Sequence, residues 1–283
     1  MKLFLLLLVL YLFQGFLLCQ IYTGKDKEIC QTKFKIAENL DLKSKPIGNV
    51  LVSIGKSFIG TDYKAYTLES EGEEKLIVNM TELDCTTFLE NVLALSCLIK
   101  KDSATFENYL KELTFIRYRS GIINSYTSRL HYFSDWIYDN VKKNVIKDVT
   151  KILGGVAVNF HLNFMSGHPS LYKHLKENAA FIPVIQTQED LINTRTYFYI
   201  PKDRVSSIED KLKEGDLIAF TTSVKGLDIS HVGIAVKQKD DRIHLLHAPQ
   251  PDTKVQITKY PLSDYILNLN KDTGIIVLRA LEP

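Results

Sequence analysis

Five short apolar segments in the last third of the chain place the strongest constraint on its fold. They have the composition of strands and cover Leu217 to Thr221, His231 to Lys237, Ile243 to Ala248, Val255 to Thr258 and Gly274 to Ala280. Turn signals separate them, including Lys225-Gly226 and Lys239-Asp240-Asp241. Short strands joined by turns favour an antiparallel sheet.

Segments with helical spacing of apolar residues come before this sheet. Expected helices cover residues 26–40, 47–59, 85–100, 106–117 and 171–180, with one helical turn at 208–212. Isolated strands are expected at 76–79 and at 195–200, where Pro201 ends the strand. Helices followed by an antiparallel sheet predict an α+β fold in which the N-terminal helices pack on the sheet.

The first residues predict the compartment. A short positive start is followed by an almost wholly apolar run from Leu3 to Leu18, and charged sequence begins at Lys25. This pattern predicts a secretory signal peptide over residues 1–19, and hence an exported, periplasmic protein with no stable membrane insertion after cleavage. A retained N-terminal anchor is the alternative. Lipid attachment through Cys19 is disfavoured, because a small residue is expected before an acylated cysteine.

The rest of the chain, residues 20–283, is expected to form one domain, because no internal repeat or low-complexity linker divides it. The net charge is only +2, and lysines alternate with acids, so no basic stripe of the kind that binds nucleic acid is present. No second cluster of ligand residues accompanies the histidines at metal-ligand spacing. We therefore expect no metal, no cofactor and a monomer.

Three cysteines remain after the expected cleavage: Cys30, Cys85 and Cys97. An odd number in an exported protein leaves at least one free thiol. Cys85 and Cys97 lie on one expected helix, about 18 Å apart at the standard helical rise, so they cannot form a disulfide with each other. Pairing of Cys30 with Cys97 stays open.

Cys85 stands at the start of an apolar helix that runs to Lys100, directly after Asp84, which is suited to cap it. A helix N-terminus lowers the pKa of a thiol, and its first N–H groups can bind an oxyanion. A cysteine on an apolar helix is more often only a core residue, as we expect for Cys97. Position alone therefore leaves both interpretations of Cys85 open.

Two strand segments downstream carry histidines that could complete a nucleophilic site. His231 could supply an imidazolium beside the thiol, and His247, on the next strand, could orient His231. His244 and His247 are three residues apart and face opposite sides of a regular strand. Only one of those two can readily join the site.

Five short motifs follow one another in a fixed order. They are Gly60-Thr61-Asp62-Tyr63, Asp84-Cys85-Thr86, Gly215-Asp216, Ser230-His231-Val232-Gly233-Ile234 and His247-Ala248. In this order they resemble the NlpC/P60 superfamily of papain-like cysteine hydrolases, which cut bacterial cell-wall peptides. The resemblance implies a papain-like fold with a catalytic Cys85.

Longer stretches resemble the DUF1460 branch, the N-acetylmuramoyl-L-alanine amidase-like proteins. They are Leu83 to Glu90, Arg129 to Trp136, Tyr199 to Lys202 and Gly226 to Gly233. This resemblance runs from about residue 30 to the C-terminus. It implies hydrolysis of the amide between a muramic acid lactyl group and L-alanine in peptidoglycan fragments. It also implies that residues of about 98–200 form a mixed insertion that shapes a restrictive pocket.

Carried onto the matching positions, the resemblance implies a role for each site residue. Cys85 is the nucleophile, His231 the general base and later acid, and His247 the orienting residue. Tyr63 and Thr86 line the site or help to bind the oxyanion.

The insertion adds candidate substrate-binding residues, to which Ser230 is joined from the strand: Arg129, His131, Tyr132, Asp135 and Trp136. Arg129 and His131 could hold a carboxylate or a sugar oxygen, and Tyr132 or Trp136 could stack on a sugar ring. Tyr132 and Trp136 are also spaced as i, i+4 partners that pack a helix onto the core. Both interpretations stay open at this stage.

Three functions follow from these residues. The first is the amidase. The second is an endopeptidase of the same fold that cuts between D-glutamate and a diamino acid. The third is a non-catalytic module that binds the cell wall, which is less favoured because both Cys85 and His231 are present.

Overall fold

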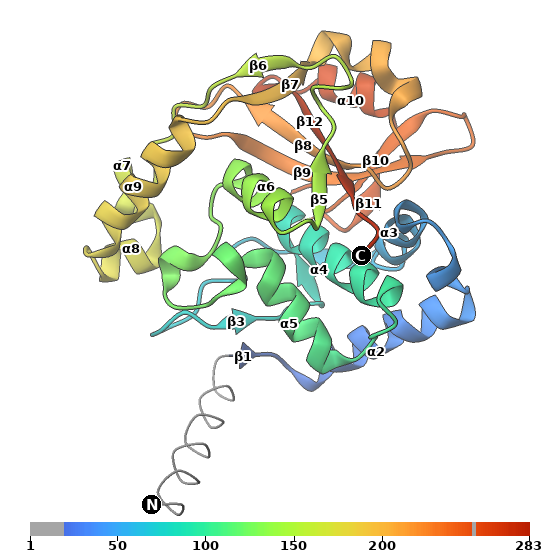
Figure 1. Cartoon of the computed structure of the whole chain (residues 1–283), viewed down its shortest axis with the longest axis horizontal. Helices are drawn as coiled ribbons and strands as arrows, with labels where there is room; N and C mark the ends of the chain where they lie inside the picture. The colour runs from blue at the N-terminus through green and yellow to red at the C-terminus, as the bar shows by residue number, and fades with distance from the viewer. Residues whose placement is uncertain (1–19, 251–252) are drawn as a thin grey trace, which may run out of the picture.

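The computed structural model describes residues 20–250 and 253–283. The expected signal peptide, residues 1–19, lies outside the described residues. Figure 1 shows helices packed below a curved sheet, with a smaller helical group at the side of the sheet. The expected α+β class is confirmed.

Within the described residues the main sheet has eight strands in the order β11-β10-β9-β8-β12-β7-β6, with β5 paired to β12. Every pairing in it is antiparallel, as expected. The strands are β5 (Ile146–Asp148), β6 (Val156–Val158), β7 (Tyr197–Pro201), β8 (Leu217–Thr222), β9 (Ile229–Lys237), β10 (Ile243–His247), β11 (Gln256–Ile257) and β12 (Asp272–Ala280). Because β5, β6 and β7 join this sheet, the middle of the chain is built into the fold.

Alternation along the central strands divides the core in two. Leu217, Val232 and Ile276 belong to the larger core, beneath the helices. Ile218 and Val277 belong to a smaller core on the other face. The sheet is therefore covered on both faces, and its side chains need no other partner.

The larger core is covered by five helices and flanked by three others (Figure 1). The covering helices are α2 (Gly24–Asn39), α3 (Ile47–Lys56), α4 (Cys85–Lys100), α5 (Phe106–Arg117) and α6 (Phe133–Lys142), and the flanking ones are α7 (Phe164–Gly167), α8 (Lys173–Glu177) and α9 (Phe181–Asn193). On the opposite face lie α10 (Leu262–Leu267) and the 3-10 helix η6 (Lys202–Lys211). Shorter 3-10 turns are η2 (Leu42–Ser44), η3 (Arg119–Gly121), η4 (Tyr126–Ser128) and η5 (Pro169–Leu171).

Helix α4 is the central helix of the larger core. Its residues from Thr87 to Ile99 are all buried, the polar Thr87, Glu90, Asn91 and Ser96 included. It begins with a capping box: the Asp84 carboxylate accepts the Thr87 N–H at 2.7 Å, and the Thr87 hydroxyl accepts the Asp84 N–H at 2.9 Å. The cap fixes Cys85 as the first helical residue.

Two small parallel pairs attach the N-terminal segments to the start of α4. Strand β1 (Gln20–Ile21) pairs with β3 (Leu76–Ile77), and β2 (Asp62–Tyr63) pairs with β4 (Glu82–Leu83). Tyr63 lies opposite Leu83 in the second pair. This register brings Tyr63 next to the segment that contains Asp84 and Cys85.

The middle of the chain departs from the expected helices. The helix expected at 171–180 is only the short α8, and the longer α9 follows it at residues 181–193. Helix α6 and helix α10 were not expected as helices. Tyr132 and Trp136 do lie within a helix and its cap, as the packing interpretation required.

The described cysteines, Cys30, Cys85 and Cys97, are all free thiols, so the Cys30–Cys97 disulfide that was left open does not form. Burial raises the pKa of both Cys30 and Cys97 to about 12, as expected for inert core thiols. Over residues 20–250 and 253–283, none of the helices is both long and apolar enough to cross a bilayer.

Candidate active site

A pair of histidines on neighbouring strands forms the centre of the site. His231 of β9 and His247 of β10 lie with Nε2 and Nδ1 2.7 Å apart, and their rings meet edge to face. Phe220 packs against the His231 ring and Tyr265 against the His247 ring. These contacts fix both ring planes, as the expected orienting role of His247 requires.

The Cys85 thiol shares a cavity of about 170 Å³ with His231. Thr86, Ser230 and Val232 also line this cavity, which places the N-terminus of α4 against the start of β9. The Val232 backbone N–H donates a hydrogen bond to the thiol sulfur. Across the described part of the chain no hydrogen bond joins the thiol to the His231 ring, and such catalytic contacts often tighten only when substrate binds.

The electrostatics of the site differ from the expected thiolate–imidazolium pair. Burial, with a further contribution from the Asp84 carboxylate, raises the pKa of Cys85 to about 12. Burial lowers the pKa of His231 to about 4 and, together with the neighbouring His231, that of His247 to about 3. At neutral pH the thiol and both imidazoles are therefore uncharged. The helix N-terminus does not overcome the cost of burying a thiolate here.

Neutral histidines leave one tautomer that suits catalysis. If His231 donates its Nε2 proton to His247 Nδ1, then His231 Nδ1 is left with a free lone pair. That nitrogen can accept a proton from Cys85. The opposite tautomer, with His247 as donor, would put a proton on His231 Nδ1 and remove the base.

Two further expected residues lie beside the thiol. The Thr86 hydroxyl is 4.0 Å from the Cys85 sulfur. Burial, together with the nearby Cys85 and Asp84, raises the pKa of Tyr63 to about 12, so its hydroxyl keeps its proton and remains a donor. Tyr63 is held near the His247 loop as well, because its N–H donates to Thr253 O at 2.9 Å.

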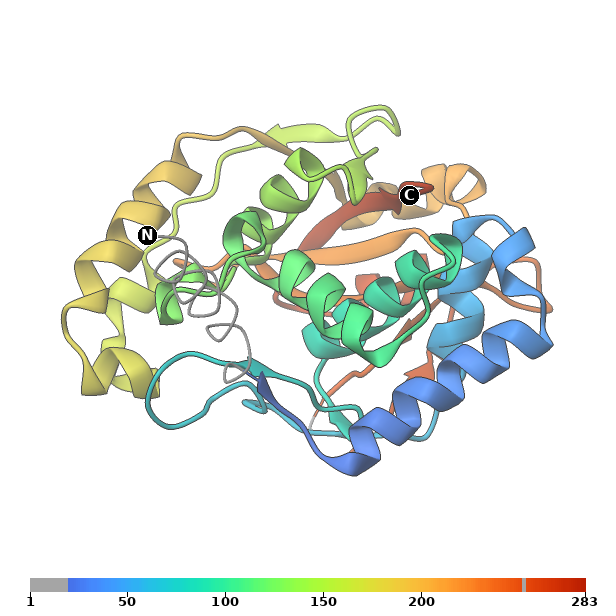
Figure 2. The ribbon, with the colours of Figure 1, turned by 60° about the horizontal axis from the view of Figure 1, so that its bottom comes forward.

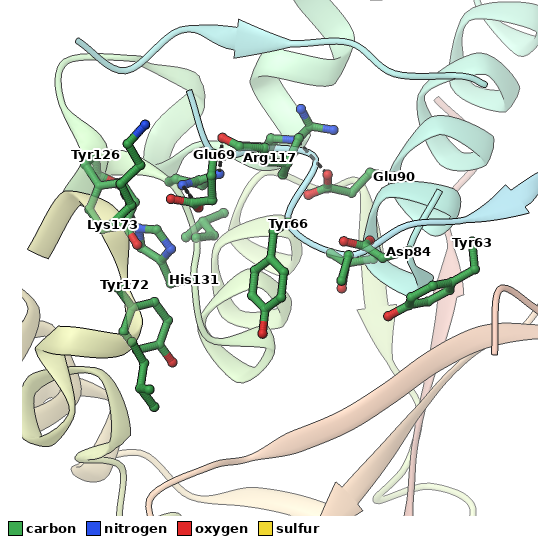
Figure 3. Close-up of a pocket in the computed structure, with 16 residues that line it drawn as sticks. Tyr63, Tyr66, Glu69, Asp84, Glu90, Arg117, Tyr126, His131, Tyr172 and Lys173 are labelled. Carbon is green, nitrogen blue, oxygen red and sulfur yellow. Dashed lines mark hydrogen bonds and ion pairs between the residues drawn. The ribbon is translucent and has the colours of Figure 1, made fainter. Parts of the chain in front are cut away.

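A larger pocket of about 630 Å³ adjoins the catalytic cavity, and the two share Thr86, Leu130, His131 and Tyr172. Figure 3 shows its tyrosines, with Tyr63 beside Asp84, Tyr66 projecting across the middle, and Tyr126 and Tyr172 on the far side. The loop after β2 forms one rim of this pocket and residues 171–173 the other. Part of the segment that the resemblance implies for a restrictive pocket thus lies next to the cysteine, together with the loop after β2, which was not expected there.

Buried ion pairs build the floor of the larger pocket. Arg117 Nε donates to Glu90 at 2.7 Å, and its Nη1 donates to Ile77 O. Arg129 donates to Leu68 O at 2.9 Å and to Glu69 at 2.8 Å. Both arginines are almost completely buried. Arg129 lines the pocket as expected, but its guanidinium group is already paired with Glu69 and holds the loop at the rim.

His131 lines both the catalytic cavity and the larger pocket. Its Nε2 lies 2.9 Å from Tyr126 O, and its ring packs on the Tyr126 ring at 4.3 Å between centroids. Burial, with Arg129 nearby, lowers the pKa of His131 well below its ordinary value. It is placed to offer a neutral hydrogen-bonding group to a ligand in either space.

The other insertion candidates are placed mainly by internal contacts. Tyr132 lines the catalytic cavity, but its hydroxyl donates to Glu189 at 2.6 Å and its side chain is buried. Asp135 is held between two arginines, Arg119 and Arg195, at 2.6 Å each. Trp136 is 0% exposed. The geometry therefore favours packing over sugar stacking for Trp136 and an internal role for Asp135.

Ser230 lines the catalytic cavity. Its hydroxyl donates to the Asp272 carboxylate and lies 3.3 Å from the Phe220 carbonyl oxygen. His244 lies away from the site, where its ring nitrogens contact Thr258 O and Asp240. This leaves His247 as the member of that pair that joins the site, as strand alternation required.

Asp228 is a buried residue of the site that the sequence motifs did not indicate as a functional position. Asp228 lies just before β9 and lines the catalytic cavity. Its carboxylate accepts hydrogen bonds from the Ser134 N–H of α6 and from the Ile229 N–H, each at 2.7 Å. It ties the start of the histidine strand to the insertion. Its place in the motif before His231 was visible in the sequence, but its burial was not.

Among the described residues no group of three or more histidine, cysteine, aspartate or glutamate side chains is arranged to hold a metal ion. The residues at the site are instead a thiol, two neutral imidazoles, hydroxyls and backbone N–H groups. This set matches nucleophilic acyl transfer, in which a base activates a thiol and N–H donors stabilise an oxyanion.

Comparison with known proteins identifies similar chains. A family model described as N-acetylmuramoyl-L-alanine amidase-like matches residues 53–275. A solved N-acetylmuramoyl-L-alanine amidase from Bacteroides uniformis is 37% identical, with 83% of this chain and 98% of that chain covered and a TM-score of 0.79. No curated protein matches the chain.

Two other solved structures are similar. A protein from Bacteroides fragilis named a putative xylanase is 40% identical, covering 80% of this chain and 98% of that one, with a TM-score of 0.72. A Legionella pneumophila protein of the DUF1460 family is 20% identical, covering 90% and 95% of the two chains with a TM-score of 0.66, and supports the fold alone.

Proposed function

Because this chain belongs to the N-acetylmuramoyl-L-alanine amidase-like family, we propose that it hydrolyses the amide bond between the lactyl group of muramic acid and L-alanine. Its substrates are peptidoglycan fragments, and Cys85 is the nucleophile. We also propose that the fold is papain-like, of the NlpC/P60 superfamily, and that the protein is exported and acts in the periplasm.

In the first step His231 Nδ1 accepts the thiol proton as the Cys85 sulfur attacks the lactyl carbonyl carbon. A carbon–sulfur bond forms and the carbonyl electrons move to the oxygen. Proton transfer accompanies the attack, because a free thiolate is costly at a buried Cys85. His247 stabilises the imidazolium that forms, because its Nδ1 accepts a hydrogen bond from His231 Nε2.

The tetrahedral intermediate then collapses. The carbon–nitrogen bond breaks as His231 returns the proton to the alanine nitrogen, which leaves as the amine of the free peptide. The remaining thioester is attacked by water, again with His231 as base, to release the muramic acid and the thiol. Atoms balance with one water consumed for each amide cleaved.

The oxyanion formed in each step needs hydrogen-bond donors. The Cys85 N–H lies at the start of α4, where the first N–H groups of a helix have no partner within it. The Tyr63 hydroxyl, which keeps its proton, can add a second donor from β2. Removing one such donor costs about 10²–10³-fold in kcat in well-studied cases.

The observation that carries this proposal is the shared cavity of Cys85 and His231, with His247 bonded behind His231. It also favours an enzyme over a non-catalytic module that binds the wall, since the whole acyl-transfer set is present. The endopeptidase alternative uses the same set and differs only in the bond that is cut.

The name of the Bacteroides fragilis relative raises glycoside hydrolysis as another reaction. That chemistry requires two carboxyl groups about 5–10 Å apart that are free to act on the glycosidic bond. The carboxylates of the larger pocket are engaged: Glu90 by Arg117, Glu69 by Arg129 and Asp84 by the cap of α4. These contacts favour the amidase.

The test is product analysis with defined muropeptides. We expect wild-type protein to release muramic acid with a complete peptide, whereas an endopeptidase would release a truncated sugar-peptide. We expect Cys85→Ala to lose activity by at least about 10³-fold while keeping its fold. The matched control is Cys97→Ala, which removes another thiol of α4 away from the cavity. Cleavage by Cys85→Ala at the wild-type rate would end the proposal.

A further inference from the structure

The larger pocket is called here the tyrosine-lined pocket, after Tyr63, Tyr66, Tyr126 and Tyr172. A second hollow, separate from it, lies on the sheet side of the catalytic cavity. Its volume is about 530 Å³, and it lies between β6, β7, the end of β8 and the loop 222–227. Leu227 lines both this hollow and the catalytic cavity. A ligand that occupies the cavity can therefore extend in two directions, toward the tyrosines or past Leu227.

The proposed chemistry decides which part of the substrate goes each way. His231 must return a proton to the leaving nitrogen, so the peptide that leaves lies on the His231 side of Cys85. His231 is on β9, which pairs with β8, and Thr221 and Thr222 at the end of β8 line the second hollow. The acyl part, which carries the sugar, lies on the side of the α4 N-terminus, where the tyrosine-lined pocket begins.

Charge gives the same assignment independently. The stem peptide carries free carboxylates from its D-glutamate onward, whereas the sugar is uncharged. The tyrosine-lined pocket has no net charge. Its three acids, Glu69, Asp84 and Glu90, are balanced by Arg117, Arg129 and Lys173. No aspartate or glutamate lines the second hollow, which contains Lys225 and His161. An anionic peptide is favoured there on electrostatic grounds.

We propose that the second hollow binds the stem peptide of the substrate, and that Lys225 pairs with the carboxylate of the second residue of that peptide. The inference rests on the proposed amidase function. Asn159, Asn163 and Ser223 supply further polar groups along the same wall. The two residues from the cleaved nitrogen to that carboxylate span about 7 Å when extended, and the hollow begins at Leu227.

The loop that carries Lys225 is rigid. Gly226 has a φ of +81°, and a side chain at that position would meet Asn163 and Phe164. The loop is closed by hydrogen bonds from Leu227 N–H to Val224 O at 3.2 Å and from Ser223 N–H to Lys271 O at 2.8 Å. Lys225 itself is exposed, and no carboxylate in the described ranges forms an ion pair with it. The backbone at Lys225 is therefore fixed, and its ammonium group is available to a ligand.

The test compares two substrates that differ in one charge. They are the γ-amides of N-acetylmuramoyl-L-alanyl-D-glutamate and of its D-isoglutamine counterpart, in which an amide also replaces the α-carboxylate. The γ-carboxyl is blocked in both because it is amide-bonded in the stem peptide, so only the α-carboxylate differs. We expect Lys225→Gln to lower kcat/KM for the glutamate substrate about 10-fold, the scale of one charge-assisted hydrogen bond. The isoglutamine substrate should change less than about 2-fold, because an amide gains little from a charged partner.

The matched control is Lys239→Gln, an exposed lysine in the turn between β9 and β10, which should leave both substrates unchanged. A second measurement needs no catalysis: calorimetric binding of free L-alanyl-D-glutamate to Cys85→Ala, which should weaken about 10-fold on adding Lys225→Gln.

The outcomes separate the two proposals. If wild-type protein cleaves both substrates and Lys225→Gln affects them equally or not at all, the peptide site is wrong and the amidase stands. If the peptide binds through Lys225 but neither substrate is cleaved at the muramoyl amide, the amidase fails and the hollow remains a site for acidic peptides.

Discussion

At Cys85 two local effects act against each other. The N-terminus of α4 and the Val232 N–H favour a thiolate, while burial and the Asp84 carboxylate oppose it. The opposing effects are larger, since the pKa of the thiol rises to about 12. Asp84 is directed to the helix cap through Thr87, but its charge still acts on the sulfur. The proposed mechanism therefore starts from a neutral thiol and a neutral imidazole, and we expect the proton to move during attack.

This neutral pair predicts an unusual pH profile. His231 must be uncharged to act as base, and burial lowers its pKa to about 4. We expect kcat/KM to rise as pH increases through about 4 and then to stay level to about pH 9. An ordinary thiolate nucleophile would instead give a rise near its pKa of about 8.5. Initial rates on a muropeptide from pH 3.5 to 9.5 measure this, and a limb near pH 8.5 would contradict the neutral pair.

In the proposed mechanism His247 fixes the tautomer of His231, so its loss should impair catalysis more than binding. We expect His247→Ala to lower kcat about 10²-fold, the usual scale of general-base assistance, with little change in KM. His247→Gln should recover part of the loss, because an amide oxygen can accept the His231 Nε2 proton. The control is His244→Gln, a buried histidine of the same strand that contacts Thr258 and Asp240 instead. An equal loss in the control would indicate a structural effect.

The loop 64–75 contains one residue with a strained backbone, Tyr66, whose side chain lines the larger pocket. Tyr66 has a φ of +62° and is 80% exposed, a combination that costs free energy without any packing in return. The remainder of the loop is fastened, by Arg129 to Leu68 and Glu69 and by Tyr118 to Glu74. The loop is thus a fixed support for Tyr66, as a residue that contacts substrate requires.

We expect Tyr66→Gly to raise KM several-fold while leaving the free energy of unfolding within about 1 kcal/mol of wild type. Glycine relieves the positive φ but loses more backbone entropy on folding, and the two effects are similar in size. Urea unfolding and steady-state kinetics measure the two quantities. Tyr260→Ala, at another exposed tyrosine, is the control. An unchanged KM in Tyr66→Gly would show that Tyr66 has no contact with substrate.

The sequence predicts an element well where one local signal is sufficient. Helix α4 was expected at its observed bounds, because a cap at Asp84 and a mainly apolar segment both mark it. Helix α9 was missed because its contacts are distant ones: Glu189 accepts from Tyr132, and Gln188 donates to Thr127 O. Pro183 lies in its first turn, where a missing N–H is tolerated. The helix expected at 171–180 covers the short α8 instead and ends before α9 begins at Phe181.

In the site too, local signals in the sequence predict where a residue lies, whereas distant contacts are not visible in it. Cys85, His231 and His247 were expected to lie together because helix start, strand order and strand alternation are local patterns that decide position. The structure brings them together, and their catalytic roles stay a prediction. Trp136 and Asp135 were not separable from substrate-binding residues in the sequence, because burial depends on the partners Glu90, Arg119 and Arg195. A polar and aromatic stretch looks the same whether its partners are a ligand or the rest of the protein.

Over the whole molecule, the site lies where three parts of the chain that are distant in sequence meet. Helix α4 supplies the thiol, β9 and β10 supply the histidines, and the insertion together with the loop after β2 encloses the larger pocket. Figure 2 shows that loop, in teal, on the same side as the yellow helices of the insertion. Lys173 of the insertion pairs with Glu71 of the loop at 3.4 Å. The shape of the pocket therefore depends on the fold as a unit.

The histidine pair links the stability of the whole molecule to pH. The pKa values of His231 and His247 fall from an ordinary 6.5 to about 4 and about 3 on folding. Between pH 6.5 and about 4 the unfolded chain therefore binds more protons at these positions than the native protein. The free energy of unfolding must fall as pH falls through that range, by up to about 1.4 kcal/mol per pH unit for each histidine. Above pH 6.5 both states are neutral at these residues, and the effect disappears.

Urea unfolding at several pH values between 4.5 and 7.5 tests this linkage. We expect the stability of His247→Gln to depend less steeply on pH than that of wild type below 6.5, because one of the two titrating groups is removed, and the two slopes to agree above 7. Carboxylates contribute equally to both proteins, so the difference isolates the histidine. The exposed His168 provides the control, since His168→Gln should keep the wild-type slope. Parallel curves for wild type and His247→Gln would mean that His247 is not buried uncharged in the native protein.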